Sequence, residues 1–223
     1  MDSKLFIRAV SRFFAGLLIV GLLLFLPAGT LRYPQAWILI GILFVPMFTA
    51  GLIMMKKNPE LLKKRLNVRE KETEQKEVIL FSGLMFLASF ILAGFSFRFG
   101  WLMLPFPASI IAVIVFLAAY ALYAEVLREN TYLSRTIEVQ EDQKVIDTGL
   151  YGIVRHPMYM ATTILFLAMP LVLASPLSFI LMLGYIPVIA KRISNEEDVL
   201  EKGLEGYQDY KKKVRYKMIP FLW

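Results

Sequence analysis

The sequence contains no cysteine and a single histidine, His156, among its 223 residues. The absence of cysteine excludes disulfide bonds, thiolate nucleophiles and cysteine-ligated metals. One histidine and no cluster of histidines with acidic residues make a zinc centre improbable, so we expect no metal. Internal repeats and low-complexity segments are also missing.

Charged residues are scarce as well: they make up 19% of the chain, against 57% apolar residues, and the mean hydropathy is +0.59. A helix needs about 20 apolar residues to cross a bilayer. The first uncharged run is followed directly by another and lacks a clear small-x-small cleavage site, so we interpret it as a membrane helix, not a signal peptide. The uncharged runs cover residues 13–31, 33–55, 78–97, 99–124 and 157–190.

The net charge of +7 could suggest nucleic-acid binding, but its distribution follows a membrane topology. If six helices cross the membrane and both termini lie on one side, all but two of the 25 Lys and Arg fall on that side. The exceptions are Arg32 and Arg98. The positive-inside rule makes the basic side cytoplasmic. We therefore expect both termini in the cytoplasm, membrane lipids as partners of the basic linker at 56–77, and no nucleic acid.

The run at 157–190 is too long for one crossing, because a single helix over it would extend about 51 Å, against a hydrocarbon core of roughly 30 Å. Pro170 and the Ala174-Ser175-Pro176 sequence interrupt it near the middle. Such breaks predict two short helices in a hairpin, which returns the chain to the cytoplasmic side at Lys191.

The predicted fold is therefore an all-α, polytopic membrane bundle of about six transmembrane helices, the last two forming a short hairpin. Helical spacing of apolar and aromatic residues over 200–214 adds a cytoplasmic C-terminal helix. Residues 136–140 (TIEVQ) alternate weakly and predict a short extended piece. We divide the chain into a four-helix membrane region, residues 1–127, and a catalytic region, residues 128–223.

The segment VIDTGLYGIVRHPMY, residues 145–159, joins a polar loop to the last apolar run. Pro157 suits the first position of a helix, and His156, which precedes it, is restricted to extended geometry outside the helix. The free N–H groups at such a helix start can bind an anionic group. Gly149 and Gly152 allow a tight turn or close approach to a ligand. We predict a ligand site here.

Together with RISNEE, LEGYQDYKKKV and a terminal IPF, this segment resembles the isoprenylcysteine carboxyl methyltransferase family. More broadly, it is similar to membrane methyltransferases that include the phospholipid methyltransferases. The resemblance covers roughly residues 130–221. It implies an enzyme that moves a methyl group from S-adenosylmethionine to a carboxylate of a lipophilic small-molecule or prenylated substrate.

The resemblance also implies site residues. Arg192 would bind the substrate, and the catalytic residues would be Arg192, Glu196 and His156. The cofactor would be bound by Gln140, Gln143, Lys144, Val145, Ile146, Tyr151, His156, Pro157, Met158, Tyr159 and Glu196.

The chemistry of these side chains agrees with that assignment. A glutamate suits the ammonium or ribose hydroxyls of the cofactor, tyrosines suit its ring, and an arginine fork suits a carboxylate. A substrate carboxylate with a pKa near about 3.5 is already ionised at neutral pH and needs no general base. An anionic oxygen meeting a cationic sulfonium neutralises both charges, which a dehydrated pocket favours.

Each assignment has a simpler alternative. His156 could only cap a helix, Tyr151 and Tyr159 could be aromatic residues at the membrane interface, and Arg192 could be a membrane-border charge. Glu197 is interpreted as a solvent-facing or lysine-paired neighbour of the site.

Other functions also remain open. A phospholipid or amine N-methyltransferase would need a base, for which His156 is the neutral-range candidate. An NADPH-dependent sterol-type reductase would need extra basic residues for the 2′-phosphate. A transporter or scaffold is disfavoured, because the apolar runs hold hardly any ionisable residue.

Overall fold

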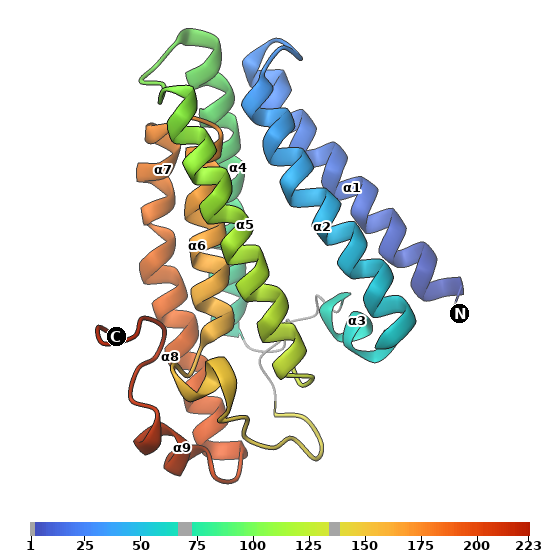
Figure 1. The fold of residues 1–223 in the computed structure, drawn as a ribbon, viewed down its shortest axis with the longest axis vertical. Coiled ribbons are helices and arrows are strands. Elements are labelled where there is room, and N and C mark those ends of the chain that lie inside the picture. The colour runs from blue at the N-terminus through green and yellow to red at the C-terminus, as the bar shows by residue number, and fades with distance from the viewer. Residues whose placement is uncertain (1–2, 67–72, 134–138) are drawn as a thin grey trace.

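The computed structural model describes residues 3–66, 73–133 and 139–223, and every regular element within these ranges is a helix (Figure 1). In chain order the elements are α1 (Ser3–Ala28), α2 (Pro34–Lys57), α3 (Pro59–Leu66), α4 (Thr73–Phe99), α5 (Phe106–Glu129), the 3-10 helix η1 (Gly149–Gly152), α6 (Pro157–Val172), α7 (Pro176–Leu183), α8 (Tyr185–Gly203) and α9 (Tyr207–Lys213). Prolines open α2, α3, α6 and α7, where the missing N–H would have no partner in the helix.

Most of these helices are built to cross a membrane. In the described residues, 5 segments are long and apolar enough to span one: Leu5–Ala28, Pro34–Lys57, Lys76–Phe99, Phe106–Glu129 and Pro176–Gly203. Helix α6 is apolar but shorter, at 16 residues. Large apolar side chains such as Phe14, Val45 and Ile111 point outward, as expected for helices that face lipid. The prediction of an all-α, multi-pass membrane protein is confirmed.

The predicted hairpin is formed by α6 and the pair α7–α8. Helix α6 ends at Val172, and Ala174 turns the chain with a φ of 58°. Ser175 then caps α7 by accepting a hydrogen bond from the backbone N–H of Ser178. The return arm runs further than the sequence indicated, because α8 follows α7 after Gly184 alone and continues to residue 203. The RISNEE segment is therefore helical.

The C-terminal region also differs from one continuous helix over 200–214. Helix α8 ends at Gly203, and Gly206 adopts the left-handed region with a φ of 81° before α9 begins. Spacing alone could not show this break, because Leu204 and Tyr207 pack on the same cluster from either side of it.

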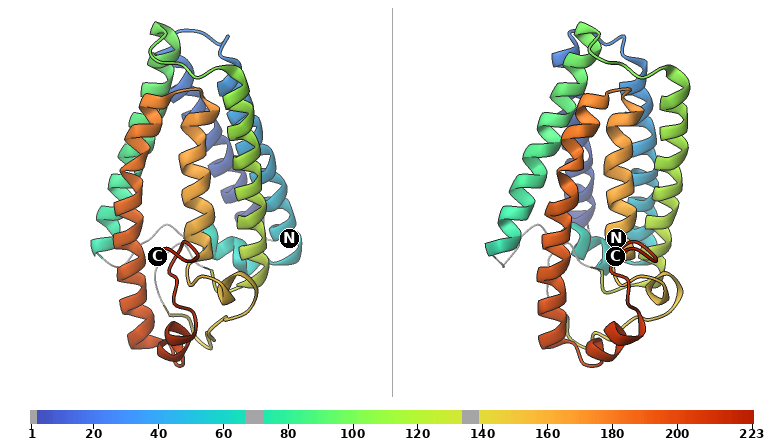
Figure 2. Two further views of the ribbon diagram at one scale, coloured as in Figure 1. Left: turned by 60° about the vertical axis from the view of Figure 1, so that its left-hand side comes forward. Right: turned by 90° about the vertical axis from the view of Figure 1, so that its left-hand side faces the viewer.

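Packing brings the helix ends together at one end of the molecule. Helices α5 and α6 lie side by side, and α4 contacts α1 on one side and α7–α8 on the other (Figures 1 and 2). Short connections at 29–33, 100–105 and 173–175 occupy the upper end in Figure 1. The lower end gathers α3, α9, η1 and the ends of the described chain. Arg32 and Arg98 thus lie at the end away from the other described basic residues, as the charge pattern predicts.

Two predictions are not settled by this architecture. Residues 136–138 of the predicted extended piece lie outside the described residues, and Val139 and Gln140 belong to no regular element. The division of the chain at residue 127 stays a prediction, although α5 packs closely on α6.

Candidate functional site

A pocket opens at the lower end of the molecule, between the start of α6, one face of α8, α9 and the segment that precedes η1. Its wall is formed by Asn130, Tyr132, Leu133, Gln143, Lys144, Val145, Ile146, Tyr151, Arg155, His156, Met158, Tyr159, Arg192, Glu196, Leu200, Leu204, Tyr207 and Tyr210.

The short helix η1 places Tyr151 in this wall. Gly149 begins η1 with a φ of 56°, a conformation that favours glycine. The Glu129 carboxylate at the end of α5 accepts the backbone N–H of Leu150, at 3.2 and 3.0 Å from its two oxygens. A Cβ atom at residue 149 would lie 1.8 Å from Glu129 Oε1. Glycine is therefore required for the carboxylate to dock here.

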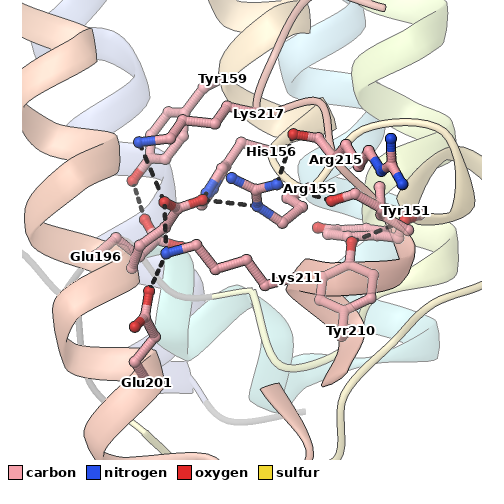
Figure 3. Close-up of polar contacts among 12 residues, drawn as sticks. Tyr151, Arg155, His156, Tyr159, Glu196, Glu201, Tyr210, Lys211, Arg215 and Lys217 are labelled. Carbon is pink, nitrogen blue, oxygen red and sulfur yellow. Dashed lines mark hydrogen bonds and ion pairs between the residues drawn. The ribbon is translucent and has the colours of Figure 1, made fainter. Parts of the chain in front are cut away.

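Beside the pocket lies a buried ionic cluster centred on Glu197, whose residue is 2% exposed. Arg155 Nε donates to Glu197 Oε1 at 2.8 Å, and His156 Nε2 lies 3.1 Å from the same oxygen. Lys217 Nζ is 3.2 Å and Lys211 Nζ 3.9 Å from Oε2. Figure 3 shows Arg155 and His156 approaching from one side and the two lysines from the other. The interpretation of Glu197 as solvent-facing is wrong; its pairing with lysine is present.

The C-terminal tail completes the hydrogen bonds of Arg155. Its Nη1 donates to the carbonyls of Val214 and Arg215 at 2.7 and 2.8 Å. The backbone N–H groups of Arg155 and His156 donate to the carbonyls of Tyr216 and Lys217 at 2.9 and 2.8 Å. The tail therefore fixes the chain just before α6, and the His156 side chain makes no capping bond to the helix.

The predicted substrate and cofactor residues are joined by Tyr159. The Tyr159 hydroxyl donates to Glu196 Oε2 and accepts from Arg192 Nε at 3.0 Å. The Arg192 guanidinium also lies 5.9 Å from the centre of the Tyr159 ring. Tyr159 and Tyr151 are 5% and 7% exposed, so neither matches the alternative of an interfacial aromatic residue.

Two further tyrosines come from α9. Tyr210 donates its hydroxyl to the backbone carbonyl of Tyr151 at 2.7 Å. The Tyr207 hydroxyl is buried without a hydrogen-bond partner among the described residues. Burial raises the pKa of both hydroxyls, so both are protonated at neutral pH. Both rings belong to an apolar cluster with Leu204, Val214, Val139, Val145 and Leu200.

The pocket thus gathers most residues that the resemblance implied. Those in its wall are Gln143, Lys144, Val145, Ile146, Tyr151, His156, Met158, Tyr159, Arg192 and Glu196. Gln140 and Pro157 are not part of the wall. The Gln140 backbone N–H donates to Gln143 Oε1 at 2.9 Å, and Pro157 is buried at the first position of α6. Ligand binding by all these residues stays a prediction.

Sequence reasoning missed Arg155 and Glu197 as an ion pair. It also missed the wall residues Asn130, Tyr132, Leu133, Leu200, Leu204, Tyr207 and Tyr210. The helical spacing of Leu200, Leu204 and Tyr207 gave a partial signal, since it indicated a shared face.

Comparison with known proteins gives a consistent result. Residues 110–202 match the sequence profile of the "Isoprenylcysteine carboxyl methyltransferase (ICMT) family". The structure is similar to that of "the eukaryotic intramembrane Ras methyltransferase ICMT", with a TM-score of 0.60 and 19% identity, over 96% of this chain and 77% of that one. At this identity the likeness shows the fold. The family resemblance predicted from the sequence is confirmed over the matched residues.

Part of the chain is also similar to a curated sterol reductase. The Delta(14)-sterol reductase TM7SF2 of Mus musculus is 30% identical over 91 residues, which are 40% of this chain. The match spans 22% of the reductase, about a fifth of its length.

Proposed function

Because residues 110–202 match the isoprenylcysteine carboxyl methyltransferase family, we propose that this membrane protein is an S-adenosylmethionine-dependent methyltransferase. Its acceptor is the carboxylate of a lipophilic substrate of the isoprenylcysteine type. The observation that supports this best is the chain of contacts from Arg192 through Tyr159 to Glu196 in the wall of the pocket. These contacts bring Arg192, which can bind a carboxylate, close to Glu196, which suits the cofactor.

The pocket wall suits S-adenosylmethionine by its chemistry. Its upper part carries His156, Tyr159, Arg192 and Glu196, which can bind charged and hydroxyl groups. Its lower part is largely apolar and aromatic and can cover an adenine ring. The predicted cofactor residues 143–146 also line the pocket.

When bound, the cofactor supplies an electrophilic methyl group on a positively charged sulfur. Arg192 would hold the acceptor carboxylate, and Tyr159 orients its guanidinium through the 3.0 Å contact with Nε. In such a transfer a carboxylate oxygen would form the new bond to the methyl carbon, the carbon–sulfur bond would break, and its electron pair would stay on sulfur. The products are a methyl ester and S-adenosylhomocysteine. No proton is transferred, so the chain needs to supply only alignment and a site that excludes water.

The contacts of His156 restrict the proton transfer that an amine acceptor would need to one ring nitrogen. An amine must lose a proton, and His156 was the candidate base. Its Nε2 lies 3.1 Å from Glu197 Oε1. The same carboxylate oxygen accepts a hydrogen bond from Arg155, so this nitrogen faces a buried cluster inside the protein. That contact occupies Nε2, so only Nδ1 is left to accept a proton from an amine.

We place the pocket and both termini in the cytoplasm. All but two of the Lys and Arg residues belong to the same end of the predicted topology as the pocket, and basic residues accumulate on the cytoplasmic side of membrane proteins. A water-soluble cofactor would enter there, and a lipophilic substrate would come from the bilayer.

Calorimetry on the detergent-purified protein tests the proposal. S-adenosylmethionine and S-adenosylhomocysteine should bind, and a prenylated cysteine analogue should gain a base-labile methyl ester. Mass spectrometry of co-purifying ligands and of methylated lipid-extract products would identify the natural substrate. A folded sample that binds neither cofactor form would overturn the assignment.

A sterol-type reductase using NADPH is the second candidate, because of the 30% identity to the sterol reductase. In the described wall the basic residues are Lys144, Arg155 and Arg192, and Arg155 is already paired with Glu197. NADPH offered to the same sample should therefore not bind. Tight NADPH binding with no S-adenosylmethionine binding would favour the reductase.

A further inference from the structure

Tyr207 lines the pocket, and its hydroxyl is a buried polar group whose role is unexplained. The residue is 4% exposed, yet its oxygen makes no hydrogen bond within the described part of the chain. A buried hydroxyl without a partner costs free energy, and native structures rarely leave one unsatisfied. A hydroxyl facing a pocket can obtain its partner from a ligand.

Its position distinguishes it from the other buried polar atoms without partners. Gln35 Oε1 and Ser109 Oγ belong to the first turns of α2 and α5, at the opposite end of the molecule. Asn195 Nδ2 is on α8, but its residue is not part of the pocket wall. Among the described residues, Tyr207 alone combines an unpartnered buried group with a place in the wall.

The surroundings of Tyr207 indicate which part of a ligand it meets. Arg192, Glu196 and Leu200 follow one another along one face of α8 at four-residue spacing, so the wall changes from charged to apolar along the helix. The Tyr207 ring belongs to the apolar end, with Leu200 and Leu204, and its hydroxyl lies within electrostatic reach of Glu196 and Glu197, where the charged part begins. The reacting sulfonium must face the acceptor at Arg192, which leaves the apolar end for the adenosyl portion.

We propose that the Tyr207 hydroxyl hydrogen-bonds the adenosyl portion of the cofactor and so helps to select an adenine nucleoside. The proposal rests on the proposed function. A flat, apolar ring with hydrogen-bonding nitrogens at its edge matches an apolar cluster that contains one free hydroxyl. The hydroxyl acts in binding and takes no part in methyl transfer.

The Tyr207→Phe variant removes this oxygen alone. The affinity for S-adenosylmethionine, measured by calorimetry, should fall about tenfold, because one hydrogen bond is lost. The melting temperature without ligand should stay the same or rise, because the removed group has no partner in the free protein. Unchanged affinity would overturn the proposal. A clear fall in the ligand-free melting temperature would also overturn it, since the hydroxyl would then have an internal partner.

Tyr210→Phe is the matched control, with a ring centred 5.8 Å from that of Tyr207. It removes the 2.7 Å bond to the Tyr151 carbonyl, so the ligand-free melting temperature should fall. The opposite signs for the two variants separate a ligand-binding hydroxyl from a structural one. If both variants lower the melting temperature equally, the proposal fails.

A ligand series locates the contact. 5′-Methylthioadenosine contains the nucleoside but lacks the amino-acid end, and Tyr207→Phe should weaken its binding as much as that of S-adenosylmethionine. If only the complete cofactor is affected, the hydroxyl contacts the amino-acid end, and the assignment to the adenosyl portion is wrong. Failure of the wild-type protein to bind any of these ligands contradicts the proposed function instead.

Discussion

At the scale of single residues, Glu197 is the side chain on which the buried ionic cluster beside the pocket depends most. One buried carboxylate neutralises Arg155 and is approached by His156 and Lys217. A guanidinium that is buried without its carboxylate is strongly unfavourable. The chain before α6 therefore depends on this one side chain for its charge balance.

Glu197→Gln tests that dependence. The variant should lose about 3–5 kcal/mol of stability, because Arg155 keeps its charge in a buried site. A thermal-shift measurement in detergent would detect this loss. Glu201→Gln is the control: Glu201 pairs with Lys211 where both side chains are part-exposed, and such pairs contribute about 1 kcal/mol or less. Equal melting temperatures for the two variants would contradict the central role of Glu197.

Tyr159 contacts both the predicted cofactor residue Glu196 and the predicted substrate residue Arg192, and the two residues should have different mutant phenotypes. Glu196→Gln should weaken cofactor binding about thirtyfold, since a charge-assisted hydrogen bond is worth on the order of 2 kcal/mol. Arg192→Lys should leave cofactor affinity intact but reduce single-turnover methylation at least about tenfold, because the planar fork is lost. Normal turnover by Arg192→Lys would make Arg192 a membrane-border charge.

Tyr159→Phe should show both defects, weaker cofactor binding and slower methylation, in one variant. Its hydroxyl bonds both Glu196 and Arg192, so the variant should reduce cofactor affinity and turnover together. Calorimetry and single-turnover assays on the same preparation would separate the two effects. A change in turnover alone would show that the contact with Glu196 is dispensable.

At the scale of elements, η1 is the part most sensitive to a small change. Gly149→Ala would put a methyl group against the Glu129 carboxylate, in a left-handed backbone conformation. Tyr151 should then shift, and S-adenosylmethionine affinity should fall at least about tenfold, since small displacements in a preformed site are costly. Gly83→Ala in α4 is the control, because nothing lies within 4 Å of its added methyl group. Equal affinities for both variants would show that η1 is not needed for binding.

The elements also show what sequence could predict. Pro157 and His156 correctly indicated where α6 begins, because proline acts locally. The sequence did not predict that α8 continues without a break through its charged residues. The charged face of this helix becomes stable only when its buried partners are in place, and these are not visible in the local sequence. The Arg155–Glu197 pair spans 42 positions along the chain, and no local pattern encodes such a pairing.

At the scale of the whole molecule, the charge distribution predicts which end faces the cytoplasm. The chain lacks cysteine, so single introduced cysteines can be labelled specifically. In intact cells a membrane-impermeant maleimide should label Leu31→Cys, whose site is 66% exposed at the upper end, and should not reach Lys212→Cys. Lys212→Cys should react after the cells are opened. Labelling of Lys212→Cys in intact cells would invert the topology.

The docking of residues 214–217 against Arg155 also determines when the site can form during synthesis. The carbonyls that bind the Arg155 guanidinium lie 59 and 60 positions further along the chain. The ribosome must therefore make α6 to α9 and deliver α6 to the membrane before this arginine can meet these carbonyls. Until then the guanidinium N–H groups that bind these carbonyls have to stay hydrated, so the nascent protein acquires its transmembrane helices first and its ligand site last.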